Sequence, residues 1–248
     1  MNVFPLDSGA SVGSAHEWDE IAVKRYELIK SGNDYSFQYV LLPCIVNEID
    51  ALDKKTIIDC GCGTGTLTKI VASHAETMVG IDISSKSIEI AKKFESASNL
   101  QYVNTSIEEY SQINSSTATL CVSNMVLMNT GNLNEIIDSI YKLLIPGGSF
   151  VFTISHPCYW PLYWDYFNAD WFNYHTETAI SADFRTSLSD NLGRSTHIHR
   201  PIDRYINVLV DTGFSLQKFT EPYPVNLPTP NLGYEYHYPR FLCITAQK

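Results

Sequence analysis

Three glycines at alternate positions form the first part of the sequence that could hold a ligand. Gly61, Gly63 and Gly65 follow Asp59, which ends the apolar run "TIID". A glycine-rich turn between a strand and a helix admits a ligand close to bare backbone. The lysine and hydroxyl that follow the glycines of a phosphate-binding P-loop are missing. The turn therefore predicts a ligand that contacts the backbone, and it argues against a P-loop.

An acidic residue stands at the end of the next apolar run. In "VGIDIS", Asp82 lies 17 positions after Gly65 (82 − 65 = 17). An acid at the end of this second strand can accept hydrogen bonds from both hydroxyls of a ribose. The GxGxG spacing differs from the GxGxxG of dinucleotide-binding folds, which disfavours a nicotinamide-dependent oxidoreductase. The two motifs together predict a ligand that contains a ribose.

The elements around these motifs alternate between strand and helix. We expect strands at 56–60, 77–82, 100–104, 118–124 and 149–155, and helices at 67–74, 84–96 and 133–145. Residues 14–50 have helical periodicity, whereas 157–198 show no clear period. A helix at 200–213 and two strands, near 215–221 and 240–247, follow. Alternating strands and helices predict a parallel, doubly wound sheet that binds ligands at the carboxyl ends of its strands.

The composition excludes several kinds of protein. The formal net charge of −10 is opposite to what phosphate backbones attract, so we expect no nucleic acid partner. The longest apolar runs fall far short of the ~18 residues of a membrane span, and the N-terminus lacks a signal-peptide pattern. We therefore predict a cytoplasmic protein without a membrane partner. Its six scattered cysteines, with no CxxC pair, predict reduced thiols and no metal site.

Four segments in order resemble a known family. "DCGCGTGTLT", "GIDIS", "VSNMVLMNT" and "LLIPGGSFVFTISHP", between about residues 55 and 157, resemble the successive motifs of class I S-adenosylmethionine-dependent methyltransferases. The "EWDEIA" segment and the late "HRPIDRYINVLVDTGF" are similar to bacterial small-molecule methyltransferases. The resemblance implies S-adenosylmethionine as cofactor. It also implies a Rossmann-like α/β fold, a doubly wound seven-stranded sheet with the last strand antiparallel.

The resemblance also implies how the chain is divided. We expect a single class I methyltransferase domain over residues 1–248. It would consist of an N-terminal helical lid at 14–50, a cofactor-binding core at 55–156, an acceptor-binding, aromatic-rich insert after the fifth strand at 157–198, and a C-terminal helix and strands at 199–248. We expect a monomer or weak homodimer.

The family's cofactor contacts carry over to matching positions. Asp59, Gly61, Gly63 and Gly65 would form the wall against the amino acid end of the cofactor, and Asp82 would bind the ribose. Ile83 would pack on the adenine. Ser106 and Ile107 would lie beside the adenine, with Ser106 where the family usually has an acid. The floor near the methionine moiety would be lined by Ser123, Asn124 and Met125.

Aromatic residues gather directly after the fifth predicted strand. Nine lie between residues 159 and 174, including three of the four tryptophans. They predict either a pocket for a flat, apolar acceptor or a loop that packs its own rings, and both can hold. The predicted acceptor contacts are Trp18, Tyr26, Tyr159, Trp160, Trp164, Trp171 and Arg200. Arg200 could pair with an acidic substrate group or merely with Asp203.

Methyl transfer needs a base when the nucleophile carries a proton that must leave. The chain offers His156 after the fifth strand, and His197 and His199 near the start of the late helix. We select His156 and His199 as catalytic candidates, because a histidine takes up a proton near neutral pH. A substrate that ionises in solution would need alignment alone.

These observations predict a methyltransferase of small-molecule, secondary metabolism. The methyl group would go to an oxygen or nitrogen nucleophile of a small aromatic or heterocyclic molecule. The alternatives are a methyltransferase that acts on tRNA or protein, a C-methyltransferase of quinone-like substrates, and a cofactor-binding protein without methyl transfer.

Overall fold

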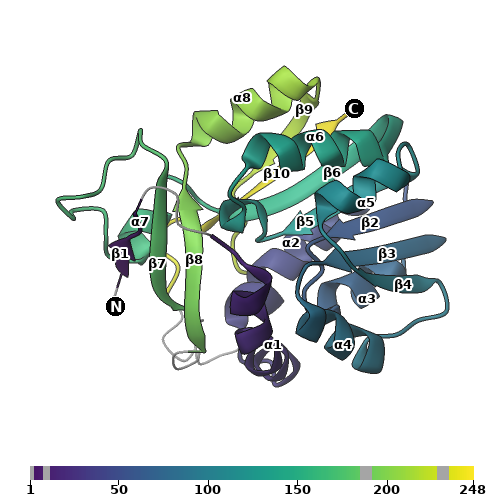
Figure 1. Ribbon diagram of the computed structural model, residues 1–248, viewed down its shortest axis with the longest axis horizontal. Helices are drawn as coiled ribbons and strands as arrows, with labels where there is room; N and C mark the ends of the chain where they lie inside the picture. Colours follow the sequence, from purple (N-terminus) through teal and green to yellow (C-terminus); the bar gives the residue numbers. More distant parts are fainter. Residues whose placement is uncertain (1–2, 8–11, 185–191, 228–234) are drawn as a thin grey trace.

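The computed structural model describes residues 3–7, 12–184, 192–227 and 235–248. Strands in this part of the chain form two sheets, one of seven strands and one of three. Figure 1 shows the three-stranded sheet at one side of the molecule, with helix α1 (Ala15–Lys30) between it and the seven-stranded sheet.

The seven-stranded sheet confirms the predicted fold. Its strand order is β4-β3-β2-β5-β6-β10-β9, and β10 runs antiparallel to both of its neighbours. The strands are β2 (Thr56–Cys60), β3 (Thr77–Asp82), β4 (Leu100–Asn104), β5 (Ala118–Asn124), β6 (Leu144–Ser155), β9 (Ser215–Thr220) and β10 (Phe241–Gln247). The carboxyl ends of β2, β3 and β5 therefore meet at one edge, as the alternation of strands and helices predicts.

Helices cover both faces of this sheet (Figure 1). One face is packed by α5 (Ile107–Ile113), α6 (Leu133–Leu143) and α8 (Ile202–Thr212), and the other by α2 (Leu42–Ile49) and α3 (Thr66–Ala72). Helix α4 (Ser85–Phe94) packs on Tyr102 of β4, and its N-cap Ser84 accepts a hydrogen bond from the Ser87 amide. Helix α6 ends at Leu143, where β6 begins, so the predicted helix was two residues too long.

The N-terminal segment is helical, as predicted. Helix α1 is followed by a five-residue π-helix, η1 (Phe37–Leu41), which continues directly into α2. Asp34 starts this run, since its carboxylate accepts a hydrogen bond from the Phe37 amide at 2.9 Å. Across the chain that the structure describes, no helix has the length and apolarity needed to span a membrane.

The three-stranded sheet was not predicted. It consists of β1 (Val3–Pro5), β7 (Thr178–Phe184) and β8 (Gly193–His199), in the order β1-β7-β8 and antiparallel throughout. A short helix, α7 (Trp160–Tyr163), precedes β7 along the chain. Strand β7 is central, so Ile180, Ser181 and Ala182 are all buried and the strand lacks a clear alternation of apolar and polar residues. Thus His199 ends a strand, and the late helix begins at Ile202.

Candidate functional site

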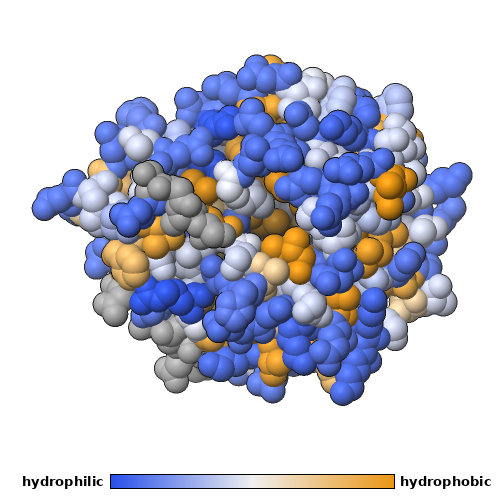
Figure 2. Space-filling model, in the orientation of Figure 1, coloured by the Kyte–Doolittle hydropathy of each residue, from blue (hydrophilic) through white to orange (hydrophobic). Residues whose placement is uncertain are grey.

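A cavity of about 420 Å³ lies between the carboxyl edge of the seven-stranded sheet, α1 and β8. Figure 2 shows a hollow near the centre of one face of the molecule, with apolar residues at its rim. One side of the cavity is lined by the strand ends and glycine turn that the sequence singles out. The other side is lined by aromatic residues from segments far apart in the chain.

The three glycines differ in what surrounds them. Each has a positive φ, which favours glycine. A Cβ at Gly61 would lie 2.4 Å from Val126 Cγ2, and one at Gly65 would lie 2.5 Å from the Tyr102 hydroxyl, so protein packing excludes both. A Cβ at Gly63 would meet nothing within 4 Å. Gly61 and Gly63 both line the cavity, with open space over the Cα of Gly63, whereas Gly65 does not line it.

Asp82 is fixed at the edge of this open space. Its carboxylate accepts hydrogen bonds from the Gly63 amide (to Oδ2) and from the Ser84 amide (to Oδ1), both at 2.8 Å. Burial raises the pKa of Asp82, although the two amides act in the opposite direction. The next residue, Ile83, is 40% exposed and lines the same cavity. An oriented carboxylate beside an exposed apolar side chain suits a ribose joined to a flat base.

Asp59 has one carboxylate oxygen without a partner. Oδ2 accepts a hydrogen bond from Thr68 Oγ1 at 2.7 Å, whereas Oδ1 is buried and has no hydrogen-bond partner among the described residues. Burial raises the pKa of Asp59 to about 7, and the negative charge of Asp82 adds to this effect. Asp59 lines the cavity, and a cationic group of a bound ligand that reached Oδ1 would supply the missing partner.

The remaining predicted cofactor contacts take different positions. Ser106, Ile107, Asn124 and Met125 line the cavity. The Ser106 hydroxyl caps α5 by accepting a hydrogen bond from the Glu109 amide at 3.1 Å, which is a structural reason for a serine there. Ser123 does not line the cavity, because its fully buried hydroxyl donates to the Cys60 carbonyl at 2.9 Å.

Comparisons with known proteins agree with this half of the site. Residues 58–152, from β2 to β6, match the family described as "Methyltransferase domain". A solved Listeria monocytogenes structure, assigned as an S-adenosylmethionine-dependent methyltransferase, is 26% identical and covers 79% of this chain and 90% of its own, with a TM-score of 0.64. Residues 58–152 of this chain therefore form a methyltransferase domain of the S-adenosylmethionine-dependent family. S-adenosylmethionine is the cofactor of this family.

The curated relatives match only part of this chain. The ubiquinone biosynthesis O-methyltransferase of Vibrio parahaemolyticus is 27% identical over 44% of this chain and 47% of its own length. The mitochondrial protein of the same name from Rattus norvegicus is 31% identical over 57% of this chain and 44% of its own length. The chain thus spans about half the length of these relatives. The Burkholderia thailandensis 1,6-didemethyltoxoflavin-N1-methyltransferase has the same fold, with 13% identity and a TM-score of 0.58 over 99% of this chain and 94% of its own.

The residues present fit this cofactor. Gly63 provides a surface without a side chain, Asp82 provides fixed hydrogen-bond acceptors, and Asp59 Oδ1 is an unsatisfied acceptor for the cofactor's ammonium group. The methyltransferase would hold the cofactor through these groups. The role of each residue stays a prediction.

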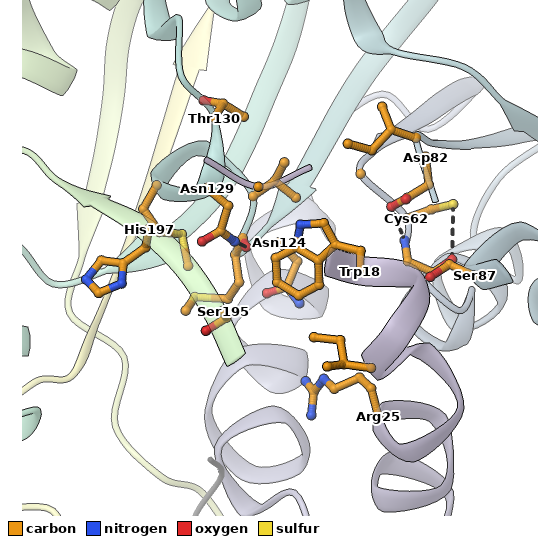
Figure 3. Close-up of a pocket in the computed structure, with 18 of the residues that line it drawn as sticks. Trp18, Arg25, Cys62, Asp82, Ser87, Asn124, Asn129, Thr130, Ser195 and His197 are labelled. Atoms are coloured by element: carbon orange, nitrogen blue, oxygen red, sulfur yellow. Dashed lines mark hydrogen bonds between the residues drawn. The ribbon is translucent and has the colours of Figure 1, made fainter. Parts of the chain in front are cut away.

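The other side of the cavity is aromatic. Trp18 of α1, Trp160 of α7 and Trp164 line it, as the sequence predicts for acceptor contacts. Figure 3 shows the Trp18 indole at the centre of the site, between Asp82 and the strand that carries Ser195 and His197. Sequence reasoning missed further lining residues, of which the more polar are Arg25, Asp34, Tyr163 and Ser195 and the more apolar are Phe37, Phe184 and Phe241.

Three predicted acceptor contacts lie outside the cavity. Tyr26 stacks on Phe94 with centroids 5.5 Å apart, and its hydroxyl contacts Glu95 at 3.0 Å. Tyr159 stacks on Tyr238 at 5.7 Å, and Trp171 stacks on Tyr166 at 5.5 Å. Trp171 belongs to a separate apolar cluster with Trp164, Tyr166 and Ile180. The aromatic insert therefore both packs on itself and contributes part of the cavity wall.

Arg200 also lies outside the main cavity and is 1% exposed. Its guanidinium donates to Glu177 Oε2 at 2.8 Å and to the carbonyls of Leu127, Thr130 and Gly131. The position of Arg200 corrects the expected substrate contact. Its side chain instead fixes residues 127–131, part of which lines the cavity.

His156 lies at the end of the fifth core strand, but its side chain faces away from the cavity. Its Nε2 is 3.0 Å from Glu221 Oε1, and its Nδ1 accepts a hydrogen bond from the Cys158 amide at 3.2 Å. Successive side chains of a strand point to opposite faces, so Ser155 lines the cavity and His156 does not. Burial lowers the pKa of His156. This geometry corrects the expectation that His156 opens on the cleft.

The two histidines of β8, His197 and His199, differ in whether they line the cavity. His199 Nε2 lies 3.0 Å from the carbonyl oxygen of Tyr174, and His199 does not line the main cavity. His197 does line that cavity, but both of its ring nitrogens are buried without a partner in the described part of the chain. Burial, with a smaller effect of His199, lowers the pKa of His197 to about 3, so the ring is neutral near pH 7. Its ring packs edge-on against Trp164 and is turned away from Trp18 in Figure 3.

Proposed function

We propose that this methyltransferase transfers a methyl group to an oxygen or nitrogen atom of a small aromatic or heterocyclic molecule. The observation that carries the proposal is that one cavity joins the Asp59, Gly63 and Asp82 groups to a wall of three tryptophans. Aromatic walls favour flat acceptors, and their faces also favour cationic groups such as a sulfonium.

S-adenosylmethionine, when bound, supplies a methyl carbon on a positively charged sulfur, and the sulfur keeps the bonding electron pair when the methyl leaves. The acceptor contributes the lone pair of the new bond and releases its proton to solvent. The chain's own residues align the two molecules. Asp82 and Gly63 hold the cofactor, while Trp18, Trp160 and Trp164 set the plane of the acceptor. Alignment and exclusion of water account for much of the rate in such displacements.

Two kinds of relative support a small acceptor. The Vibrio and rat proteins are named for O-methylation in ubiquinone biosynthesis, and the Burkholderia protein for N1-methylation of 1,6-didemethyltoxoflavin. The net charge of −10 also disfavours binding to tRNA. The proposal extends to a domain that comprises the whole chain, with α1 as part of a lid and residues 157–198 as part of the acceptor site.

The test begins with cofactor binding. S-adenosylmethionine and S-adenosylhomocysteine should raise the melting temperature, whereas NAD and NADP should not. Asp82→Ala should weaken S-adenosylhomocysteine binding about 10- to 100-fold by calorimetry, because charge-assisted hydrogen bonds are lost. Asp211→Ala, at an exposed carboxylate on α8, is the matched control. Unchanged affinity in Asp82→Ala would remove this residue from the site.

The acceptor itself can be found by mass spectrometry. Small molecules released from denatured protein should include an aromatic or heterocyclic compound. Incubation with labelled S-adenosylmethionine should add one methyl to it. Transfer of label only to tRNA or to protein would contradict the proposal.

A further inference from the structure

Three consecutive residues of α1 contact three different parts of the site. Glu17 binds β8, Trp18 lines the cavity, and Asp19 binds the start of α4. Figure 1 shows α1 between β8 on one side and α4 on the other. This first turn of α1 therefore joins the part of the site beside Asp82 to the part formed by the three-stranded sheet.

Asp19 is connected to Asp82 through a single residue. The Ser84 amide donates to Asp82 Oδ1 at 2.8 Å, and the Ser84 hydroxyl donates to Asp19 Oδ1 at 2.6 Å. The Lys86 amide, in the first turn of α4, donates to the same Asp19 oxygen at 2.9 Å. Ser84 is fully buried. A ligand that fixes the loop from Asp82 to Ser84 therefore also fixes the bond between Ser84 and α1.

Glu17 makes the corresponding contact on the acceptor side. Its carboxylate accepts hydrogen bonds from both the amide and the hydroxyl of Thr196, the latter at 2.8 Å. The Thr196 hydroxyl also accepts a hydrogen bond from the Gly13 amide at 2.8 Å. Thr196 lies between Ser195 and His197, which both line the cavity. Glu17 therefore fixes the stretch of β8 that forms this wall.

Trp18 stands between these two attachments. Its indole lines the cavity and meets Phe184 of β7 edge-on at 6.3 Å. In Figure 3 it separates Asp82 from Ser195 and His197. A cofactor held at Asp82 would contact this side chain and so hold α1 in place from the cavity as well as through Ser84.

We propose that Glu17 and Asp19 are positioning residues that couple cofactor binding at Asp82 to the order of β8. The proposal rests on the proposed cofactor site. On the side that faces α1, strand β8 can separate only if the Glu17–Thr196 bonds break or α1 leaves α4. A ligand that stabilises the docked helix makes both events rarer. Cofactor binding then prepares the acceptor wall, and the two ligands bind with positive cooperativity.

Hydrogen exchange tests the coupling without a known acceptor. In the wild type, saturating S-adenosylhomocysteine should slow amide exchange in residues 193–199 by about fivefold or more. Glu17→Ala should exchange faster in this strand without ligand, and the ligand should no longer slow it. The dissociation constant of S-adenosylhomocysteine, measured by calorimetry, should change by less than about threefold, because Glu17 is attached to the other side of the helix.

Three further variants separate positioning from a loss of stability. Glu17→Gln keeps an oxygen for the Thr196 amide and should restore part of the ligand-induced protection. Glu20→Ala removes an exposed carboxylate from the same helix, whose recorded ion-pair partner is His16, and should behave as wild type. Asp19→Asn should weaken S-adenosylhomocysteine binding about fivefold and also reduce the protection of β8.

The outcomes distinguish the coupling from the cofactor site itself. If S-adenosylhomocysteine does not bind the wild type, the proposed function fails. If it binds and slows exchange in β8 equally in the wild type and in Glu17→Ala, the ligand acts on β8 directly and the coupling is overturned. If it binds and leaves β8 exchange unchanged in the wild type, the coupling is also overturned.

Discussion

The two halves of the cavity are assembled in different ways. The cofactor half comes from residues 59–126, in which each strand is followed by a turn and a helix, so neighbouring strand ends carry its groups. The acceptor half comes from residues 12–41 and 155–164, and from Phe184, Ser195, His197 and Phe241. The first half depends on local connections repeated along the chain. The second exists only when segments separated by more than 100 residues pack together.

The two halves also differ chemically. The cofactor half holds carboxylates whose hydrogen bonds are fixed by backbone amides, as at Asp82, and it leaves one oxygen of Asp59 unpaired. The acceptor half is a wall of aromatic rings, with the buried, neutral His197 among them. We therefore expect substitutions in the cofactor half to lower cofactor affinity by amounts that differ strongly from one position to the next. Substitutions in the acceptor half should mainly change the binding of the acceptor or the stability of the fold.

The largest expected effect is at Gly63. Gly63→Val places a side chain into the open space over the turn, where a Cβ meets no protein atom within 4 Å. It should lower S-adenosylhomocysteine affinity more than about 100-fold, because the ligand and the side chain need the same volume. Calorimetry measures the affinity, and circular dichroism should show the fold retained.

The control for Gly63→Val is Gly147→Val. Gly147 also has a positive φ and also has nothing within 4 Å of a built Cβ, but it lies at the far end of the sheet, in β6. Both variants should lose some stability from the strained backbone, about 1–3 kcal/mol. Only Gly63→Val should lose cofactor binding. Equal loss in both would show that strain, and not occupied space, is the cause.

The signals from which the sequence predicts the cofactor half are local. Glycines with positive φ and an acid at a strand end are visible without knowing what packs on them. What could not be predicted is why each glycine is needed, since Val126 and Tyr102 approach Gly61 and Gly65 from other elements. The β7–β8 hairpin was missed because β7 is buried on both faces and pairs with β1, more than 170 residues earlier. The expectation that His156 faces the cleft was wrong because it considered only where the strand ends. Which face a side chain points to depends on the register of the strand.

The second largest expected effect, after that of Gly63→Val, is the pH dependence of cofactor binding. Asp59 has a pKa of about 7 without ligand, and a bound ammonium group should lower it. The ligand then binds the ionised form, so affinity should rise with pH by up to about tenfold per unit below pH 7 and level off above it. Asp59→Asn should bind more weakly at pH 8 and lose this dependence. Calorimetry from pH 5.5 to 8 measures both.

The stability of the ligand-free protein should fall as pH rises, whereas cofactor affinity should increase. The folded state holds a proton on Asp59 that the unfolded state releases at its usual pKa of 3.8, so the free energy of unfolding should fall as pH rises from about 4 to about 7. Asp59→Asn should lack this contribution. A wild-type protein with the same affinity at pH 5.5 and 8 would contradict the assignment of Asp59 to the cofactor.

A smaller effect separates two tryptophans of the insert. Trp164 lines the cavity, whereas Trp171 stacks on Tyr166 outside it. Trp164→Ala should raise the acceptor KM about tenfold, because it removes part of the aromatic wall. Both variants should lower the melting temperature, since both remove packed rings. Steady-state kinetics with an acceptor found by mass spectrometry measures the difference, and an equal rise in KM for Trp171→Ala would contradict it.

The smallest expected effect is at His156. Its ring lies against Glu221 and the Cys158 amide, on the opposite face of β6 from the cavity-lining Ser155. His156→Gln should therefore change kcat by less than about threefold at saturating substrates, while it lowers the melting temperature because the Cys158 amide loses its acceptor. The same kinetics, followed by thermal unfolding, measures both quantities.

The pH profile makes the argument about His156 decisive. A histidine base must be unprotonated to act, so its loss removes a rising limb from the pH–rate curve. The His156 ring contacts Glu221 and the Cys158 amide and does not line the cavity, so it should contribute no such limb. The wild type and His156→Gln should then have parallel profiles between pH 6 and 8. A fall in kcat of about 100-fold, with loss of a limb, would instead establish His156 as the base and require β6 to turn its end toward the cavity during the reaction.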